Sequence, residues 1–313
     1  MSTSGEYVHQ TVLLDEAIAA LAIRPEGVYV DGTFGCGGHS AAILDRLAAH
    51  GRLVAMDKDP QAVEAGRVRF AADRRFYIER GSFALLRQLT DRLGLTGKVD
   101  GILLDLGVSS PQLDDPRRGF SFIKDGPLDM RMDPDSSPTA AAWLAKASEA
   151  EIAEVLKTYG EERYARRIAR AIIATRHQAP ITTTVQLADL IVAAVPTRER
   201  YKHPATRSFQ AIRIFINREL EELREVLAHS LVVLAVYGRL VAISFHSLED
   251  RIVKRFLQRQ AASQSGPRGL PIINERKTGG FRKLGRVIRP SPAECDRNPR
   301  ARSAVLRVSE KLP

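Results

Sequence analysis

The sequence predicts an α/β fold in which helices cover both faces of a mostly parallel β-sheet. Strand and helix patterns alternate over the first hundred residues, and several strands are short apolar runs that end on a carboxylate. After Gln112 the pattern changes to loops rich in Asp, Pro and Gly and then to about four helices. We therefore expect a discontinuous α/β domain, residues 1–112 and 216–313, that is interrupted by a helical insertion, residues 113–215.

The expected elements follow from hydrophobic periodicity and from turn residues. Strands are expected at 28–31, 52–57, 75–79, 99–105, 239–245, 282–288 and 302–308. Helices are expected in the insertion at 149–159, 161–177 and 182–195, and after it at 248–259. One long helix is also expected, because an apolar stripe continues from Phe209 to Leu227 at helical spacing.

A glycine-rich turn follows the first expected strand, in the string Asp31-Gly32-Thr33-Phe34-Gly35-Cys36-Gly37-Gly38-His39-Ser40. Glycines let backbone lie against a ligand where a Cβ would clash, and the start of a helix near Ser40 offers unpaired N–H groups. The second strand ends on Asp57, where an acid can accept hydrogen bonds from both ribose hydroxyls of an adenosine cofactor. These features predict a nucleotide-type cofactor site, although a purely structural glycine turn would give the same loop.

Three expected strands end on an acid, namely Asp31, Asp57 and Asp105. Ligands of open parallel sheets bind beyond the carboxyl ends of the strands. We therefore expect the three carboxylates to face one crevice.

The chain carries a formal net charge of +10, which favours an anionic partner such as nucleic acid, with general solubility as the alternative. The basic loop 197–204 and the segment 276–302, which holds nine Lys or Arg against two acids, are the expected phosphate-facing segments. Only two cysteines occur, Cys36 and Cys295, so neither a disulfide framework nor a metal site is expected. Because no signal peptide or membrane span is recognisable, we expect a cytoplasmic location without membrane association.

Eight strings, in one order along nearly the whole chain, resemble a bacterial family, the small-subunit (16S) ribosomal RNA cytosine-N4 methyltransferases. The strings are His9–Leu14, Asp31–His39, Asp105–Gln112, Arg118–Phe122, Gly126–Asp133, Arg213–Asn217, Ser244–Arg251 and Asn298–Arg300. The resemblance implies a class I S-adenosylmethionine-dependent methyltransferase fold, which is Rossmann-like, with an inserted helical domain that recognises RNA. It also implies methylation of the exocyclic N4 of a cytidine in the decoding region of 16S ribosomal RNA, within the small ribosomal subunit. The oligomeric state stays open.

The resemblance also implies roles for individual residues. The cofactor S-adenosyl-L-methionine is expected to contact Gly37, Gly38, His39, Asp57, Phe83, Asp105 and Gln112. The candidate readers of the base or its phosphate are Phe122, Asp129, Arg131, Asp133 and His246, and for the last four a structural role is the alternative.

The chemistry indicates which groups assist the transfer. The lone pair of the cytosine amine is delocalised into the ring, so hydrogen-bond acceptors at the amino protons would make the nitrogen more nucleophilic. Asp105, Ser109 and Ser110 are the candidates for this catalytic role. Many amino-group methyltransferases carry an aromatic residue after this strand, whereas this chain does not, so Phe120 and Phe122 are the alternative stacking partners.

Two other classes of function share part of this pattern. A nicotinamide-dependent oxidoreductase would use the glycine loop and Asp57 but leaves the string Asp105–Gln112 without a role. A non-catalytic ribosome assembly factor would use the basic surfaces alone and would tolerate substitution of Asp57 or Asp105. The methyltransferase hypothesis explains the most features.

Overall fold

The computed structural model describes residues 10–136, 138–197, 203–262 and 280–313. The chain forms two compact units, unit 1 (residues 1–107 and 220–313) and unit 2 (residues 108–219). The sequence placed the boundaries at 112/113 and 215/216. The insertion is larger at both ends because it includes a short helix around Gln112 and the whole of a helix that ends at Asn217.

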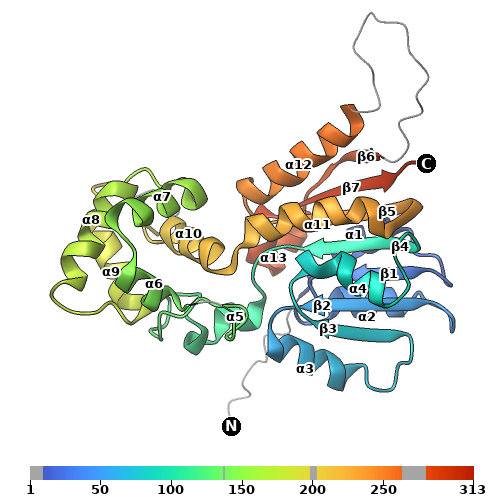
Figure 1. Ribbon diagram of the computed structural model, residues 1–313, viewed down its shortest axis with the longest axis horizontal. Helices are drawn as coiled ribbons and strands as arrows, with labels where there is room; N and C mark the ends of the chain where they lie inside the picture. The colour runs from blue at the N-terminus through green and yellow to red at the C-terminus, as the bar shows by residue number, and fades with distance from the viewer. Residues whose placement is uncertain (1–9, 137, 198–202, 263–279) are drawn as a thin grey trace, which may run out of the picture. The chain divides into compact units, whose positions relative to one another are not determined.

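Unit 1 is built on a seven-stranded sheet with the order β3-β2-β1-β4-β5-β7-β6 (Figure 1). Strands β1 to β5 pair with one another in parallel, and β7 is antiparallel to both β5 and β6. The strands are β1 (Val28–Asp31), β2 (Arg52–Asp57), β3 (Phe76–Arg80), β4 (Val99–Asp105), β5 (Leu234–Ser244), β6 (Phe281–Ile288) and β7 (Val305–Lys311). Strand β5 begins before the expected residue 239, because its first residues continue along β4 through a register shift around Gly238.

Helices cover both faces of this sheet, and the strand residues alternate between them. Tyr29, Leu53 and Leu103 pack with helices α1 and α2, whereas Val30 and Leu104 pack with helices α4, α11 and α12. Burial on both faces explains the nearly continuous apolar runs of these strands. The helices of unit 1 are α1 (Leu14–Leu21), α2 (Gly38–Leu44), α3 (Pro60–Arg69), η1 (Phe83–Leu85), α4 (Leu86–Arg92), α11 (Glu219–Val233), α12 (Ser247–Ala262), α13 (Pro292–Arg297) and η3 (Pro299–Ser303).

The two ends of unit 1 are joined by hydrogen bonds. The N–H group of Leu13 donates to a carboxylate oxygen of Glu294 at 2.7 Å, across 281 positions of sequence. The side-chain amide of Asn298 donates to the carbonyl oxygen of Gln10 at 2.9 Å. Helix α1 is therefore held in place by the segment around α13.

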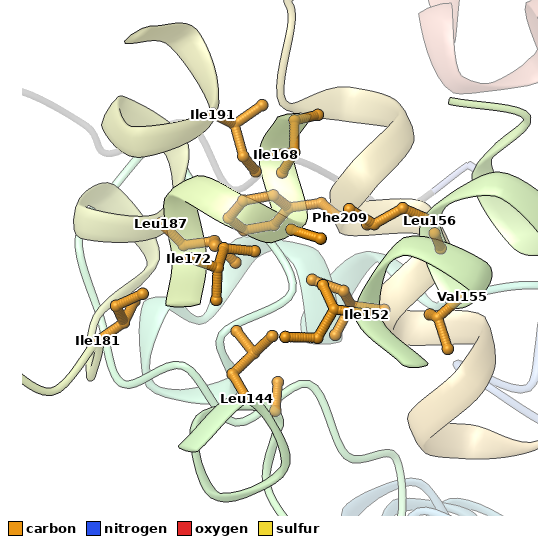
Figure 2. Close-up of a cluster of buried hydrophobic side chains, with 14 of the residues drawn as sticks. Leu144, Ile152, Val155, Leu156, Ile168, Ile172, Ile181, Leu187, Ile191 and Phe209 are labelled. Atoms are coloured by element: carbon orange, nitrogen blue, oxygen red, sulfur yellow. The ribbon is translucent and has the colours of Figure 1, made fainter. Parts of the chain in front are cut away.

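Unit 2 is helical and has its own hydrophobic core. Figure 2 shows aliphatic side chains of several helices gathered around Phe209. Its helices are α5 (Ser110–Asp114), η2 (Pro116–Arg118), α6 (Ala140–Lys146), α7 (Glu149–Gly160), α8 (Ala165–Arg176), α9 (Thr184–Ala194) and α10 (Thr206–Asn217). In the described parts of both units, no helix is both long and apolar enough to cross a membrane.

The expected long helix from Phe209 to Leu227 is wrong. Helix α10 ends at Asn217, Arg218 takes a left-handed backbone conformation with φ of 52°, and α11 begins at Glu219. Phe209 is buried in the core of unit 2, whereas Leu227 is buried in the core of unit 1. One apolar stripe thus serves two separate cores.

Candidate active site

The carboxyl ends of β1, β2 and β4 carry three carboxylates, Asp31, Asp57 and Asp105. Each has a pKa above the ordinary value, and in all three the largest cause is burial. The charge of Asp31 also contributes to raising the pKa of Asp57 and of Asp105. The expectation that ligands bind beyond the carboxyl ends of parallel strands therefore identified three acids that share one electrostatic environment.

Asp31 organises the loop that follows β1. Its side chain is 1% exposed, and it accepts hydrogen bonds from the Thr33 N–H group at 3.1 Å and from the Ser40 hydroxyl at 2.7 Å. The Thr33 hydroxyl oxygen accepts the N–H group of Asp105 at 2.6 Å, which ties the loop to β4. Burial disfavours the charged carboxylate more than these hydrogen bonds stabilise it, so the pKa of Asp31 is raised to about 6.

The glycines of the loop are required by the packing of the protein itself. Gly37 has φ of 73°, and a Cβ there would lie 2.6 Å from the ring of Phe34. A Cβ on Gly38 would lie 1.9 Å from the hydroxyl oxygen of Thr11. Helix α2 begins at Gly38, two residues before the expected start near Ser40, with Gly37 as its N-cap. Packing within the protein therefore accounts for both glycines, and the predicted cofactor contact, which stays a prediction, would involve their backbone.

Asp57 anchors the same loop from β2. One carboxylate oxygen accepts the N–H group of Gly35 at 2.8 Å, and the other accepts the N–H group of Asp59 at 2.9 Å. Burial raises the pKa of Asp57 to about 6, against the lowering effect of these two bonds. Each carboxylate oxygen can accept more than one hydrogen bond, so Asp57 can still bind hydroxyl groups such as those of a ribose.

Asp105 is the acid whose partners within the protein are incomplete. Its Oδ1 atom is buried and has no hydrogen-bond partner among the described residues. Its Oδ2 atom lies 3.6 Å from Nδ1 of His39, which is 5% exposed. Burial, followed by the charges of Asp31 and Glu249, raises the pKa of Asp105 well above its usual range. A buried carboxylate oxygen without a donor is suited to a ligand that carries N–H groups or a positive charge.

Phe83 lies beside the loop as well. It is half-buried at the start of η1, and a Cβ on Gly32 would lie 3.5 Å from the Cβ of Phe83. An apolar ring at this place can pack against the face of an adenine.

Glu249 is a buried acid that the sequence reasoning missed. It is 2% exposed and accepts the N–H groups of Phe245 at 2.8 Å and of His246 at 3.3 Å. Its other oxygen lies 3.2 Å from Nε2 of His246, which was expected to contact the substrate. Glu249 lies three residues after the position that immediately precedes helix α12. An acid at this spacing is a capping signature, so spacing could have identified Glu249.

Three other candidates, Ser109, Ser110 and Gln112, belong to unit 2. Ser109 is the N-cap of α5, and its N–H group donates to the side-chain oxygen of Gln112 at 3.0 Å. Gln112 is buried, and Ser110 is the first residue of the helix. The structure gives Ser109 and Gln112 a helix-capping role and leaves their catalytic or cofactor-binding roles as predictions.

Three of the predicted base readers, Asp129, Arg131 and Phe122, have partners within unit 2. Asp129 and Arg131 form a bidentate ion pair at 2.7 and 2.8 Å. Phe122 packs against Phe209, with ring centroids 4.7 Å apart, while Phe120 is 6% exposed and has little surface for a base. Of these aromatic rings, Phe122 keeps the larger accessible surface.

The predicted phosphate-facing segments are only partly described. Residues 198–202 of the loop and 276–279 of the basic segment lie outside the described residues. Within β6, Lys283 and Arg286 are exposed, and Arg282 pairs with Glu310 at 2.6 Å.

The sheet order, with antiparallel β7 between β5 and β6, and the acids at the ends of β1, β2 and β4 define a class I S-adenosylmethionine-dependent methyltransferase. The chain belongs to the MraW methylase family, whose model matches residues 6–312. The resemblance stated from the sequence strings is therefore confirmed at the level of the family.

Two relatives of high sequence identity agree with this assignment. The chain is 61% identical over 313 residues to the ribosomal RNA small subunit methyltransferase H of Thioalkalivibrio sulfidiphilus, with 100% of both chains covered. It is 55% identical over 312 residues to the protein of the same name from Shewanella amazonensis, with 99% of both chains covered. Among solved structures, an rRNA methylase from Streptococcus thermophilus gives a TM-score of 0.40 at 12% identity, covering 98% of this chain and 99% of that chain.

Proposed function

We propose that this methyltransferase transfers a methyl group from S-adenosylmethionine to the exocyclic N4 of a cytidine in the decoding region of 16S ribosomal RNA. The names of the relatives support a ribosomal RNA substrate of the small subunit. The choice of N4 and of the decoding region rests on the family resemblance of strings such as Asp105–Gln112. We place the activity in the cytoplasm, where the small ribosomal subunit is available as substrate.

The observation that carries the proposal is the partly buried carboxylate of Asp105, with an unpartnered oxygen beside Asp31 and His39. Negative charge at this edge favours a cationic sulfonium, and the unpartnered oxygen can accept an N–H group of the substrate. Asp57, which already holds the loop through Gly35, is assigned to the ribose. The backbone of Gly37, Gly38 and His39, the ring of Phe83 and the amide of Gln112 complete the proposed cofactor site.

When bound, S-adenosylmethionine supplies an electrophilic methyl group. The cytosine nitrogen would form a bond to this methyl carbon as the carbon–sulfur bond breaks and its electron pair stays on sulfur, and the nitrogen must release one proton. A hydrogen bond from the amino group to Asp105 would localise the nitrogen lone pair, and the raised pKa of Asp105 suits it to receive the proton. Ser109 and Ser110 are the alternative acceptors. Alignment of the reacting groups supplies the rest of the rate, because it replaces a bimolecular encounter.

Unit 2 is assigned to substrate recognition. Phe122 is the proposed stacking surface for the cytosine, since Phe120 is buried. Asp129 and Arg131 act in this proposal as a fixed pair that positions the loop, and His246 in unit 1 is oriented by Glu249.

The test is methyl transfer from labelled S-adenosylmethionine to small ribosomal subunits that lack the modification, followed by nucleoside mass spectrometry. N4-methylcytidine is expected. A different methylated nucleoside would refute the base assignment and keep the cofactor assignment. Absence of cofactor binding by calorimetry would refute the cofactor site.

Two variants separate the proposed roles. Asp105→Asn should lower transfer by at least about a hundredfold while the protein still folds, because Asn cannot receive the proton. Ser109→Ala should lower transfer much less. The reverse order of effects would assign the proton to the serine.

A further inference from the structure

Helix α8 of unit 2 presents an arginine surface that the proposed transfer does not use. Its buried side is formed by Ala165, Ile168, Ala169 and Ile172. Arg166, Arg167 and Arg170 lie on the opposite side, and Arg163 precedes the helix; all four are exposed.

Few acids neutralise this surface. Arg170 lies 3.8 Å from Glu149, and both side chains are largely exposed, so this ion pair contributes little. Among the described residues, Arg166 and Arg167 have no carboxylate within ion-pair distance. Arg166 and Arg170 are about 6 Å apart along the helix axis, close to the separation of consecutive phosphates in an extended strand. The surface therefore matches a chain of negative charges.

A groove of about 550 Å³ lies beside these arginines, between α8 and α9. Ala171, Leu190 and Ala193 give it apolar walls, and Arg167 also lines it. Gln186 adds a polar group. Its side-chain oxygen accepts the N–H groups of Thr182 and Thr183, so its NH2 group is the end that can donate to a ligand. An apolar groove of this volume with a few polar groups is suited to a planar organic ring.

We propose that the α8–α9 surface binds a single-stranded segment of the RNA substrate, with phosphates on the arginines and one unpaired base in the groove. The proposal rests on the proposed function for the identity of the RNA. Phosphate contacts supply sequence-independent affinity, and a base in an apolar groove adds contact that a paired strand cannot make. The arrangement selects unpaired RNA, because bases within a duplex are stacked and cannot enter the groove.

The arginine half of the proposal is tested by Arg163→Ala/Arg166→Ala/Arg167→Ala. Its matched control is Arg46→Ala/Arg52→Ala/Arg74→Ala. This variant removes the same charge from exposed positions of unit 1 near the starts of β2 and β3. Binding of a single-stranded RNA of about 12 nucleotides is measured by fluorescence anisotropy at several salt concentrations. The α8 variant should bind about tenfold or more weakly, and its log–log salt slope should fall by about 2, since each single-strand phosphate contact contributes about 0.7. Equal losses in the two variants would overturn the assignment to α8.

The groove half is tested without a change of charge. Ala171→Trp fills the groove. If this variant folds poorly, Ala193→Trp fills the groove from an exposed position on α9. Either variant should weaken binding of the single-stranded RNA by about fivefold to tenfold and leave binding of a duplex of equal length unchanged. Unchanged single-strand affinity in a folded variant would exclude a base from the groove. An acidic peptide that displaces the RNA at equal charge concentration would overturn the RNA assignment in favour of an acidic protein.

These results are independent of methyl transfer. Failure of the proposed function appears as absence of N4-methylcytidine with the wild-type protein. Failure of the present proposal appears as unchanged RNA affinity in the α8 and groove variants.

Discussion

Replacing Asp31 by Asn should stabilise the folded protein at about pH 8, although Asp31 belongs to the candidate active site. The Asn side chain has the same shape and keeps both hydrogen bonds. Its oxygen can accept the Thr33 N–H group, and its NH2 group can donate to the Ser40 hydroxyl, which then turns to act as acceptor. What the substitution removes is a buried negative charge.

The magnitude follows from the raised pKa of Asp31. Burial raises that pKa from the ordinary 3.8 to about 6, and each pKa unit corresponds to about 1.4 kcal/mol, so the charged form costs the folded state about 3 kcal/mol. Because the folded pKa is the higher one, the unfolded chain ionises first as pH rises. The wild-type protein therefore loses this stability between about pH 4 and about pH 6, and Asp31→Asn does not. The two proteins should be similar at about pH 4 and differ by about 3 kcal/mol above about pH 7.

Urea denaturation followed by circular dichroism, repeated across this pH range, measures the difference. Asp296→Asn, on an exposed helix of the same unit, is the control for loss of one charge and should change the unfolding free energy by less than about 0.5 kcal/mol. An Asp31→Asn protein that is less stable than wild type at about pH 8, or a difference that does not vary with pH, would refute the reasoning.

Three further outcomes are expected. Asp57→Ala should weaken S-adenosylmethionine binding by at least about tenfold, because the proposed ribose acceptor and the anchor of Gly35 are lost together; equal calorimetric affinity would contradict the assignment. Wild-type affinity for the cofactor should fall as pH drops through about 6, where Asp57 becomes neutral, and a flat titration would show that its charge does not contribute. Asn217→Ala should destabilise unit 2 by about 2 to 4 kcal/mol, because the buried Asn217 side chain accepts a hydrogen bond from the Met132 N–H group and donates one to the Met130 carbonyl oxygen. Thermal denaturation measures this change, and a value below about 0.5 kcal/mol would refute the expectation.

The strands of the sheet could be predicted from the sequence because they are buried on both faces and end on polar residues. The expected ranges 28–31, 52–57 and 99–105 coincide with β1, β2 and β4. The break at Arg218 was not readable, because the apolar spacing continues through it and a non-glycine residue with positive φ leaves no local signal. Hydrophobic periodicity shows which side of a helix is buried, but it does not show which hydrophobic core that side packs against.

The candidate site was predictable to the same extent. Asp31, Asp57 and Asp105 were found because strand ends of a parallel sheet meet at one edge. Glu249 was missed as a site residue, because its spacing indicates only a helix cap, whereas its influence on Asp105 comes from tertiary packing of α12. Ser109 and Gln112 have the three-residue spacing of a capping box, which the structure shows, and their catalytic and cofactor-binding roles stay predictions.

The interruption of unit 1 by unit 2 has a consequence for synthesis on the ribosome. Strand β4 pairs with β5, which is made only after all of unit 2, and helix α1 needs Glu294, 281 positions after Leu13. Contacts inside unit 2 are more local, so this unit can fold while the rest of the chain is still being translated. A folded unit 2 leaves fewer freely moving residues between β4 and β5 than an unfolded insertion of the same length, which lowers the entropic cost of pairing the two strands. The helical insertion would then act as a folding aid for the sheet, and the catalytic unit would become complete only when the last strands have been synthesised.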